Sequence, residues 1–155
     1  MPTDDRDRYM AENVTWLLEQ AEPDARIILW AHNGHVANRV GPNGEKSMGA
    51  SLREIYEGKM MVFGFAFYQG RFNAVSYDSK TGRYGRLCPH KAPPAPQGNY
   101  EWYFRAAEIP RMILDLRGVS GISPATNWLT EPHEFRSIGA SMTIMLPRSI
   151  FTTLT

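Results

Sequence analysis

The sequence has little cysteine and little net charge, and each shortage excludes a class of protein. Cys88 is the one cysteine among 155 residues, which excludes an intramolecular disulfide and is typical of a reducing compartment. Lys and Arg together number 17 against 16 Asp and Glu, a formal charge of +1. We therefore expect neither a nucleic-acid partner nor an anionic membrane partner.

Long apolar runs are absent as well. Stretches such as residues 60–67 are far too short to span a bilayer. The first residues, MPTDDRDRYM, carry acids and lack the apolar segment of a signal peptide. A soluble cytoplasmic protein is therefore the expectation.

The composition that remains is that of a globular protein. Apolar residues make up 43% of the chain and charged residues 21%, a balance that separates it from disordered and fibrous sequences. A chain of this length is long enough to bury a core and fits one ordinary domain. We predict a single domain over residues 1–155.

Helical periodicity and capping residues predict helices at three places. Over residues 6–21 the apolar positions recur with helical spacing, and Pro23 ends the pattern. Ser47 is a good N-cap for a second helix, which Gly58 closes. Asn99 can cap a third, shorter helix through residue 107.

Short apolar stretches predict the strands, over residues 27–31, 60–67, 72–77, 111–117 and 138–146. Residues 27–31 are apolar on both faces, which is typical of a central parallel strand. Gln69-Gly70 makes a tight connection between 60–67 and 72–77 and predicts an antiparallel hairpin. The expected fold class is α/β, with packed helices on a mixed parallel and antiparallel sheet. Residues 78–99, rich in proline, are interpreted as a long irregular loop.

The most informative polar residues are two histidines at the end of the first predicted strand. His32 and His35 follow Trp30-Ala31, at the kind of strand end where α/β proteins bind ligands. Imidazole exchanges a proton near neutral pH, so this pair suits general acid–base work or stabilisation of an oxyanion. Two other interpretations remain open: both histidines are structural, or they ligate zinc with scattered further ligands.

Other polar residues give weaker signals. Arg6 and Asp7 near the first helix are candidates for a site, although a solvated helix end explains them as well. Cys88 has only His90 as a neighbouring base, and little else argues for a reactive thiol. The chain contains no nucleophile elbow, P-loop or dinucleotide fingerprint.

Taken together, several segments resemble the erythromycin esterase family, which includes succinoglycan-biosynthesis homologues. The similarity extends over positions 6–140 and rests on these stretches: Arg6-Asp7-x-x-Met10-Ala11-Glu12-Asn13-Val14-x-Trp16-Leu17, Trp30-Ala31-His32-Asn33-Gly34-His35-Val36, Met48-Gly49-x-x-Leu52, Phe63-Gly64-Phe65-x-Phe67, Gly70-x-Phe72-x-Ala74, Leu114-Asp115-Leu116-Arg117 and Arg136-Ser137-Ile138-Gly139-Ala140.

This resemblance implies hydrolysis of an ester or a macrolactone by histidine-assisted attack of water, with a link to macrolide antibiotics. It gives His32 and His35 a catalytic role and makes Asn33, Arg6 and Asp7 candidates for substrate binding. It also implies a metal-independent mechanism without a cofactor. The expected partner is a small-molecule ester or lactone.

The family pattern also includes an N-terminal part, with a Gly-Glu-x-x-His segment that carries the catalytic base, and this part has no counterpart here. Residues 141–155 also differ from the usual ending. We therefore expect an isolated chain of little activity and self-association through uncovered apolar surface. Two alternatives follow: a truncated, non-catalytic fragment that keeps a ligand-binding pocket, and a metal-dependent hydrolase.

Overall fold

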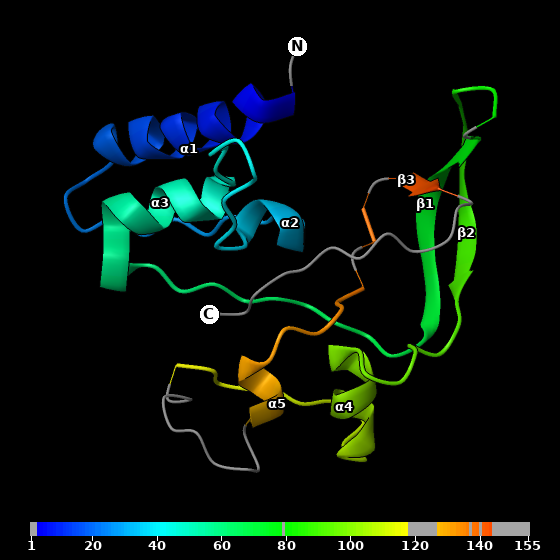
Figure 1. Ribbon diagram of the computed structural model, residues 1–155. Coiled ribbons are helices and arrows are strands. Elements are labelled where there is room, and N and C mark those ends of the chain that lie inside the picture. The colour runs from blue at the N-terminus through cyan, green and yellow to red at the C-terminus, as the bar shows by residue number, and fades with distance from the viewer. Residues whose placement is uncertain (1–2, 79, 118–126, 137, 140, 144–155) are drawn as a thin grey trace. The chain divides into compact units, whose positions relative to one another are not determined.

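Helices and strands occupy different parts of the chain in the computed structural model, which describes residues 3–78, 80–117, 127–136, 138–139 and 141–143 (Figure 1). The chain divides into two compact units between Phe65 and Ala66. The described part of the first unit is helical, and that of the second contains the sheet and two further helices. The presence of both helices and strands is confirmed, whereas a single domain over residues 1–155 stays a prediction.

The first unit is built on two helices that lie side by side, α1 (Thr3–Glu19) and α3 (Met48–Tyr56) (Figure 1). Both helices were predicted, and their presence is confirmed. One face of each supplies the buried apolar core, which consists of Ala11, Val14, Met48 and Leu52. Full burial of an aliphatic side chain contributes about 1.5–3 kcal/mol, so this small cluster holds the pair together.

Ser47 begins α3, as predicted, and also ties the helix to the preceding loop. Its side chain is fully buried and its Oγ accepts a hydrogen bond from the Ala50 amide at 3.2 Å. The same oxygen donates to the carbonyl of Ala37 at 2.5 Å. The predicted end at Gly58 was wrong by one residue, because Glu57 takes the left-handed turn, with φ of 44°, and opens the short 3-10 helix η1 (Glu57–Lys59).

Three of the predicted strands, at residues 27–31, 60–67 and 111–117, are wrong. These segments form no ladder with any residue that the structure describes. Ile28 is 93% exposed and Trp30 87% exposed, so the apolar faces that suggested a buried strand lie open in these segments. A strand requires a neighbour for its backbone hydrogen bonds, and the described chain supplies none here.

The second unit contains an antiparallel hairpin of β1 (Gly70–Asp78) and β2 (Arg83–Ala92). A strand at residues 72–77 was predicted correctly, but its expected partner at 60–67 was not. β2 lies within the 78–99 interval, so the interpretation of that interval as an irregular loop was wrong for residues 83–92. Pro89 is tolerated in β2 because this strand is at the edge of the described sheet, in the order β2-β1-β3.

β3 (Ser141–Thr143) pairs with β1 in parallel. It falls inside the predicted strand at 138–146, and the remainder of that prediction from residue 144 onward lies outside the described residues. The expected divergence of residues 141–155 from the family ending likewise concerns mainly residues that the structure does not describe. The complete mixed α/β sheet stays a prediction.

Aromatic rings fill the space around α4 (Tyr100–Ala106) and α5 (Asn127–Thr130) in the second unit. Tyr100 is buried at the centre, its hydroxyl donates to the carbonyl of Glu131 at 2.8 Å, and burial raises the pKa of that hydroxyl. The rings in contact around it are Phe104, Trp128, His133 and Phe135. This cluster is a packed core of the kind that aromatic side chains form.

Arg136, from the last part of the quoted family pattern, has a structural role in this unit. Its Nη1 donates to the carbonyls of Tyr68 at 3.2 Å and Pro93 at 2.8 Å. Its backbone amide donates to Oε1 of the buried Glu101 at 2.7 Å. One arginine therefore joins the segment before β1, the segment after β2 and helix α4.

Within the described part of the chain, helices are either too short or too polar to cross a lipid bilayer.

Candidate functional site

The two predicted histidines lie on one tight turn. His32 is the N-cap of α2 (Asn33–Val36), a single helical turn, and His35 lies within it. Their ring centroids are 6.5 Å apart and the ring planes meet at 79°. Both side chains are half-buried, so the turn brings two imidazoles to one place without sealing them in the core.

Asp7 fixes the orientation of His35 from the neighbouring helix α1. Nδ1–H of His35 donates to Oδ1 of Asp7 at 2.7 Å, and the two side chains are 26% and 13% exposed. An ionised carboxylate only accepts hydrogen bonds, so the proton of the neutral imidazole resides on Nδ1. The contact thereby makes Nε2 the basic nitrogen of His35, as in the histidine–carboxylate pairs of hydrolases.

The second carboxylate oxygen of Asp7 binds the start of helix α3. Oδ2 accepts a hydrogen bond from the backbone amide of Met48 at 3.1 Å, and Met48 is the first residue of α3. The positive end of the α3 dipole favours a carboxylate at this place. One side chain on α1 thus connects α2 to α3. Asp7 was predicted as a substrate-binding residue, and that role stays a prediction.

The ring of His32 is in the other tautomer from that of His35. Its Nδ1 accepts a hydrogen bond from the amide of Gly34 at 3.1 Å, which caps the turn. A neutral imidazole that accepts at Nδ1 carries its proton on Nε2. His32 therefore carries its ring proton on Nε2, whereas Nε2 is the basic nitrogen of His35.

Asn33 contacts the extended segment that follows α3. Its Nδ2 donates to the carbonyl of Phe65 at 2.6 Å, and its Oδ1 accepts from the amide of Phe65 at 3.1 Å. The ring of Phe65 lies 5.5 Å from that of Trp30, between centroids. Substrate binding by Asn33 stays a prediction, with part of its amide occupied by Phe65.

Arg6 stays a prediction as a substrate-binding residue. It is exposed on α1 and forms no ion pair with the described residues. Asp115 and Arg117, a second pair from the family pattern, bind each other at 2.6 Å on the surface. The Arg117 guanidinium lowers the pKa of Asp115 to about 2, so this is a solvated ion pair.

Gly49 is a packing position beside the histidine turn that was not singled out from the sequence. A Cβ at this residue would overlap the backbone carbonyl of Val36, and it would lie 2.7 Å from the carbonyl oxygen of Ala37. Glycine therefore lets α3 approach the end of α2 closely. The Met48-Gly49 pair in the family pattern was a signal that this position has a special role.

Other candidate side chains form separate groups. Sγ of Cys88 lies 3.5 Å from Nε2 of His90, but the same nitrogen is 3.1 Å from the carbonyl of Ala74 and stabilises the hairpin. Among the described residues, His, Cys, Asp and Glu side chains form no cluster of three or more that could hold a metal ion.

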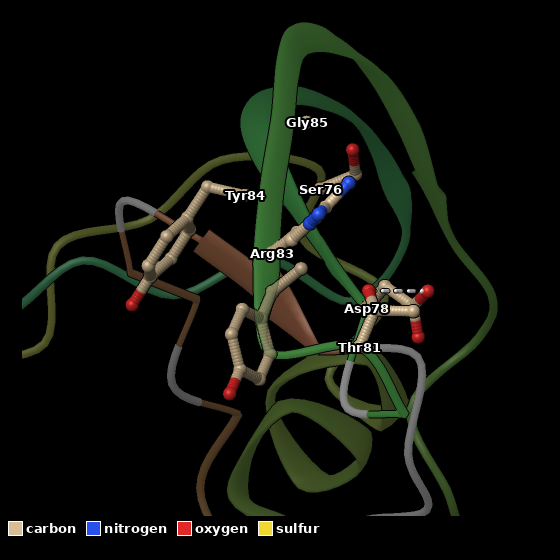
Figure 2. Close-up of a pocket in the computed structure, with 7 residues that line it drawn as sticks. Ser76, Asp78, Thr81, Arg83, Tyr84 and Gly85 are labelled. Atoms are coloured by element: carbon tan, nitrogen blue, oxygen red, sulfur yellow. Dashed lines mark hydrogen bonds between the residues drawn. The ribbon is translucent and has the colours of Figure 1, made fainter.

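A cavity of about 360 Å³ lies at the tip of the β1–β2 hairpin (Figure 2). Neither His32 nor His35 lines it. Asp78 accepts hydrogen bonds from the Thr81 hydroxyl and the Lys80 amide, and these bonds lower the pKa of its carboxyl. The residues that line the cavity are Ser76, Tyr77, Asp78, Thr81, Arg83, Tyr84 and Gly85. The Asp78 carboxylate is thus engaged in the turn itself.

The first unit thus combines a histidine–carboxylate pair with a second histidine nearby, and comparison with known proteins gives the family of the chain. The family model for erythromycin esterase matches residues 2–150. The chain belongs to the erythromycin esterase family, as the sequence resemblance predicted.

The chain is also similar to two bacterial proteins, one in sequence and one in fold. It is 30% identical over 138 residues to the Bacillus subtilis (strain 168) protein named Putative hydrolase YbfO, a match that covers 82% of this chain and 28% of that protein. Its fold is similar to a crystal structure of a Bacillus cereus protein, with a TM-score of 0.77 and 24% identity over 99% of this chain and 38% of that one. The chain thus spans less than two fifths of the length of either relative.

Proposed function

We propose that this chain contributes the His35–Asp7 pair and His32 to an ester hydrolase site, and that the substrate is a carboxylic ester or a macrolactone. The observation that carries the proposal is the 2.7 Å contact of His35 with Asp7, beside an imidazole in the other tautomer. Family membership supports hydrolysis as the reaction class. The name of the family supports a macrolide lactone as one substrate type.

In the proposed mechanism, Nε2 of His35 removes a proton from water while the water oxygen attacks the ester carbonyl carbon. Asp7 stabilises the imidazolium that forms. Nε2–H of His32 donates to the oxyanion of the tetrahedral intermediate. The carbon–oxygen bond of the ester then breaks, and the alkoxide leaves with the proton that His35 returns. Acid and alcohol are the products, and no covalent intermediate with the protein is formed.

Turnover of p-nitrophenyl acetate by an excess of the purified chain tests this role. Positioned proton transfer typically accelerates a reaction by about 10²–10⁴-fold. For this chain we expect an acceleration at the lower end of that range. His35→Gln should remove the acceleration. Erythromycin A, followed by mass spectrometry for the addition of water, tests the macrolactone.

The matched control is His90→Gln, which removes one imidazole and leaves the Asp7 contact intact. A histidine side chain without a special environment also hydrolyses activated esters slowly, so equal rates for the two variants would refute a special role for His35. A rise in melting temperature with an ester ligand, without turnover, would instead support the non-catalytic fragment. Loss of turnover to a chelator, with stoichiometric zinc, would support the metal-dependent alternative.

We also propose that the chain associates with itself through the first unit. Ile28 is 93% exposed and Phe63 61% exposed, on extended segments whose backbone forms no ladder with the described residues. Such segments are templates for pairing with another copy. Light scattering should show an average mass that rises with protein concentration.

The double substitution Ile28→Ser and Phe63→Ser should shift the protein toward the monomer. Tyr84→Ser is the control, because Tyr84 is 69% exposed on β2 in the second unit. A constant monomer mass for the unaltered chain, or the same shift with Tyr84→Ser, would refute association through these segments.

A further inference from the structure

Residue 33 lies between the two histidines, and its side chain is used in an unusual way. A single carboxamide takes both backbone hydrogen-bonding groups of Phe65, donating to its carbonyl at 2.6 Å and accepting from its amide at 3.1 Å. In an antiparallel sheet, two residues that lie opposite each other on adjacent strands exchange the same pair of hydrogen bonds. Asn33 thus replaces, for one residue, the strand partner that the extended segment otherwise lacks among the described residues.

The turn that carries the histidines requires such support. α2 has four residues, and an isolated helical turn is unstable because nucleation costs more than one turn of hydrogen bonds returns. His35 is held from one side by Asp7. Phe65 contacts two residues near His32: Trp30, two residues before it, through its ring, and Asn33, directly after it, through its amide.

We infer that Asn33 is a positioning residue, which holds the turn that carries His32 and His35 against Phe65. The structural role of Asn33 rests on its two hydrogen bonds to Phe65. Its importance for catalysis rests on the proposed function. Asn33 acts through its neighbours. It requires one donor and one acceptor, which a carboxamide supplies and an ionised carboxylate does not.

Hydrogen exchange of the Phe65 amide tests the inference without any need for turnover. In the unaltered chain this amide should exchange more slowly than those of Phe63 and Gly64, which lie in the same extended segment. Asn33→Ala should speed its exchange about tenfold, the effect of one lost hydrogen bond. Rates are divided by the intrinsic rate at each pH.

Asn33→Asp gives the decisive measurement. At neutral pH the introduced carboxylate can accept from the Phe65 amide but repels its carbonyl, so the protection should be weakened. Below the pKa of the introduced carboxyl the group gains an O–H donor, and protection of Phe65 should recover. A purely space-filling role would give no such recovery, since the shape of the side chain does not change.

The ¹⁵N spectrum of the histidine rings supplies the second readout. Asn33→Ala should mix the two tautomers of His32, whereas His35 should keep Nδ1–H through Asp7. Asn13→Asp, on the exposed face of α1, is the matched control and should change neither ring. An unprotected Phe65 amide in the unaltered chain, or identical behaviour of Asn33→Asp and Asn33→Ala at every pH, would overturn the inference. Loss of turnover in His35→Gln would then still support the proposed function.

Discussion

Asp7→Ala should lower the free energy of unfolding of the first unit by about 2–4 kcal/mol, because the carboxylate makes two charge-assisted hydrogen bonds in a mostly buried place. Removal of the carboxylate leaves the backbone amide of Met48 without its acceptor at 3.1 Å, and Met48 is only 3% exposed. It also frees the imidazole of His35 to rotate. Urea unfolding followed by the amide signals of α1 and α3 measures the loss.

Asp7→Asn separates stability from chemistry at the same position. The amide oxygen can still accept from Met48, so most of the stability should remain. Its nitrogen is a donor, however, and it favours the tautomer of His35 with the proton on Nε2. The base is then absent from the site although the fold is kept, and ester turnover should fall as far as in His35→Gln.

The control for both substitutions is Asp24→Ala, in the exposed turn after α1, for which we expect a change within about 0.5 kcal/mol. If Asp7→Ala proves as mild as Asp24→Ala, the carboxylate does not bridge α2 and α3. If Asp7→Asn leaves the His35 tautomer unchanged in the ¹⁵N spectrum, the assignment of Nε2 as the base is wrong.

Helices were predictable from the sequence because their signals are local. The apolar spacing over residues 6–21 and the Ser47 cap each lie within a few residues of what they determine. The resulting elements, α1 and α3, agree with the predictions to within two or three residues at most ends. The cap at Gly58 failed because Glu57 itself adopts a positive φ, which a non-glycine residue seldom does.

Strands were less predictable because their partners are remote. Apolar alternation at 60–67 indicates an extended backbone, which is present, but does not name a neighbour. The hairpin of β1 with β2 was missed because Pro89 argued against a strand. A usable signal was there: Asp78 and Gly82 bracket a turn in which Gly82 has φ of 67° and its amide donates to the Asp78 carbonyl at 2.8 Å.

The site was partly predictable for the same physical reason. His32 and His35 are close in sequence, so a single turn brings them together. Asp7 is 28 residues from His35, and sequence reasoning assigned it to the substrate. Its helical spacing was informative, since Asp7 lies four residues before Ala11 and seven before Val14, both buried. A carboxylate on the buried face of a helix requires a partner.

Among substitutions that add a single methyl group to the first unit, Gly49→Ala should cause the largest loss of stability. The added Cβ would overlap the carbonyl of Val36, and a backbone atom cannot rotate away as a side chain can. α3 would have to move from α2, against the bonds of Ser47 to Ala37 and of Asp7 to Met48. We expect a loss of about 3 kcal/mol, at the upper end for overpacking.

The same displacement should change the environment of His35. When α2 and α3 move apart, Asp7 cannot keep its hydrogen bonds to both His35 and Met48. In Gly49→Ala the ¹⁵N spectrum should therefore show His35 without its fixed Nδ1–H, even under conditions where the unit is still folded. Gly58→Ala is the matched control: a Cβ there meets no heavy atom within 4 Å, and reduced freedom of the unfolded chain should stabilise the protein by about 0.5 kcal/mol. Similar stability of the two variants would mean that α2 and α3 are not in close backbone contact, and the geometry that joins Asp7 to His35 would lose its support.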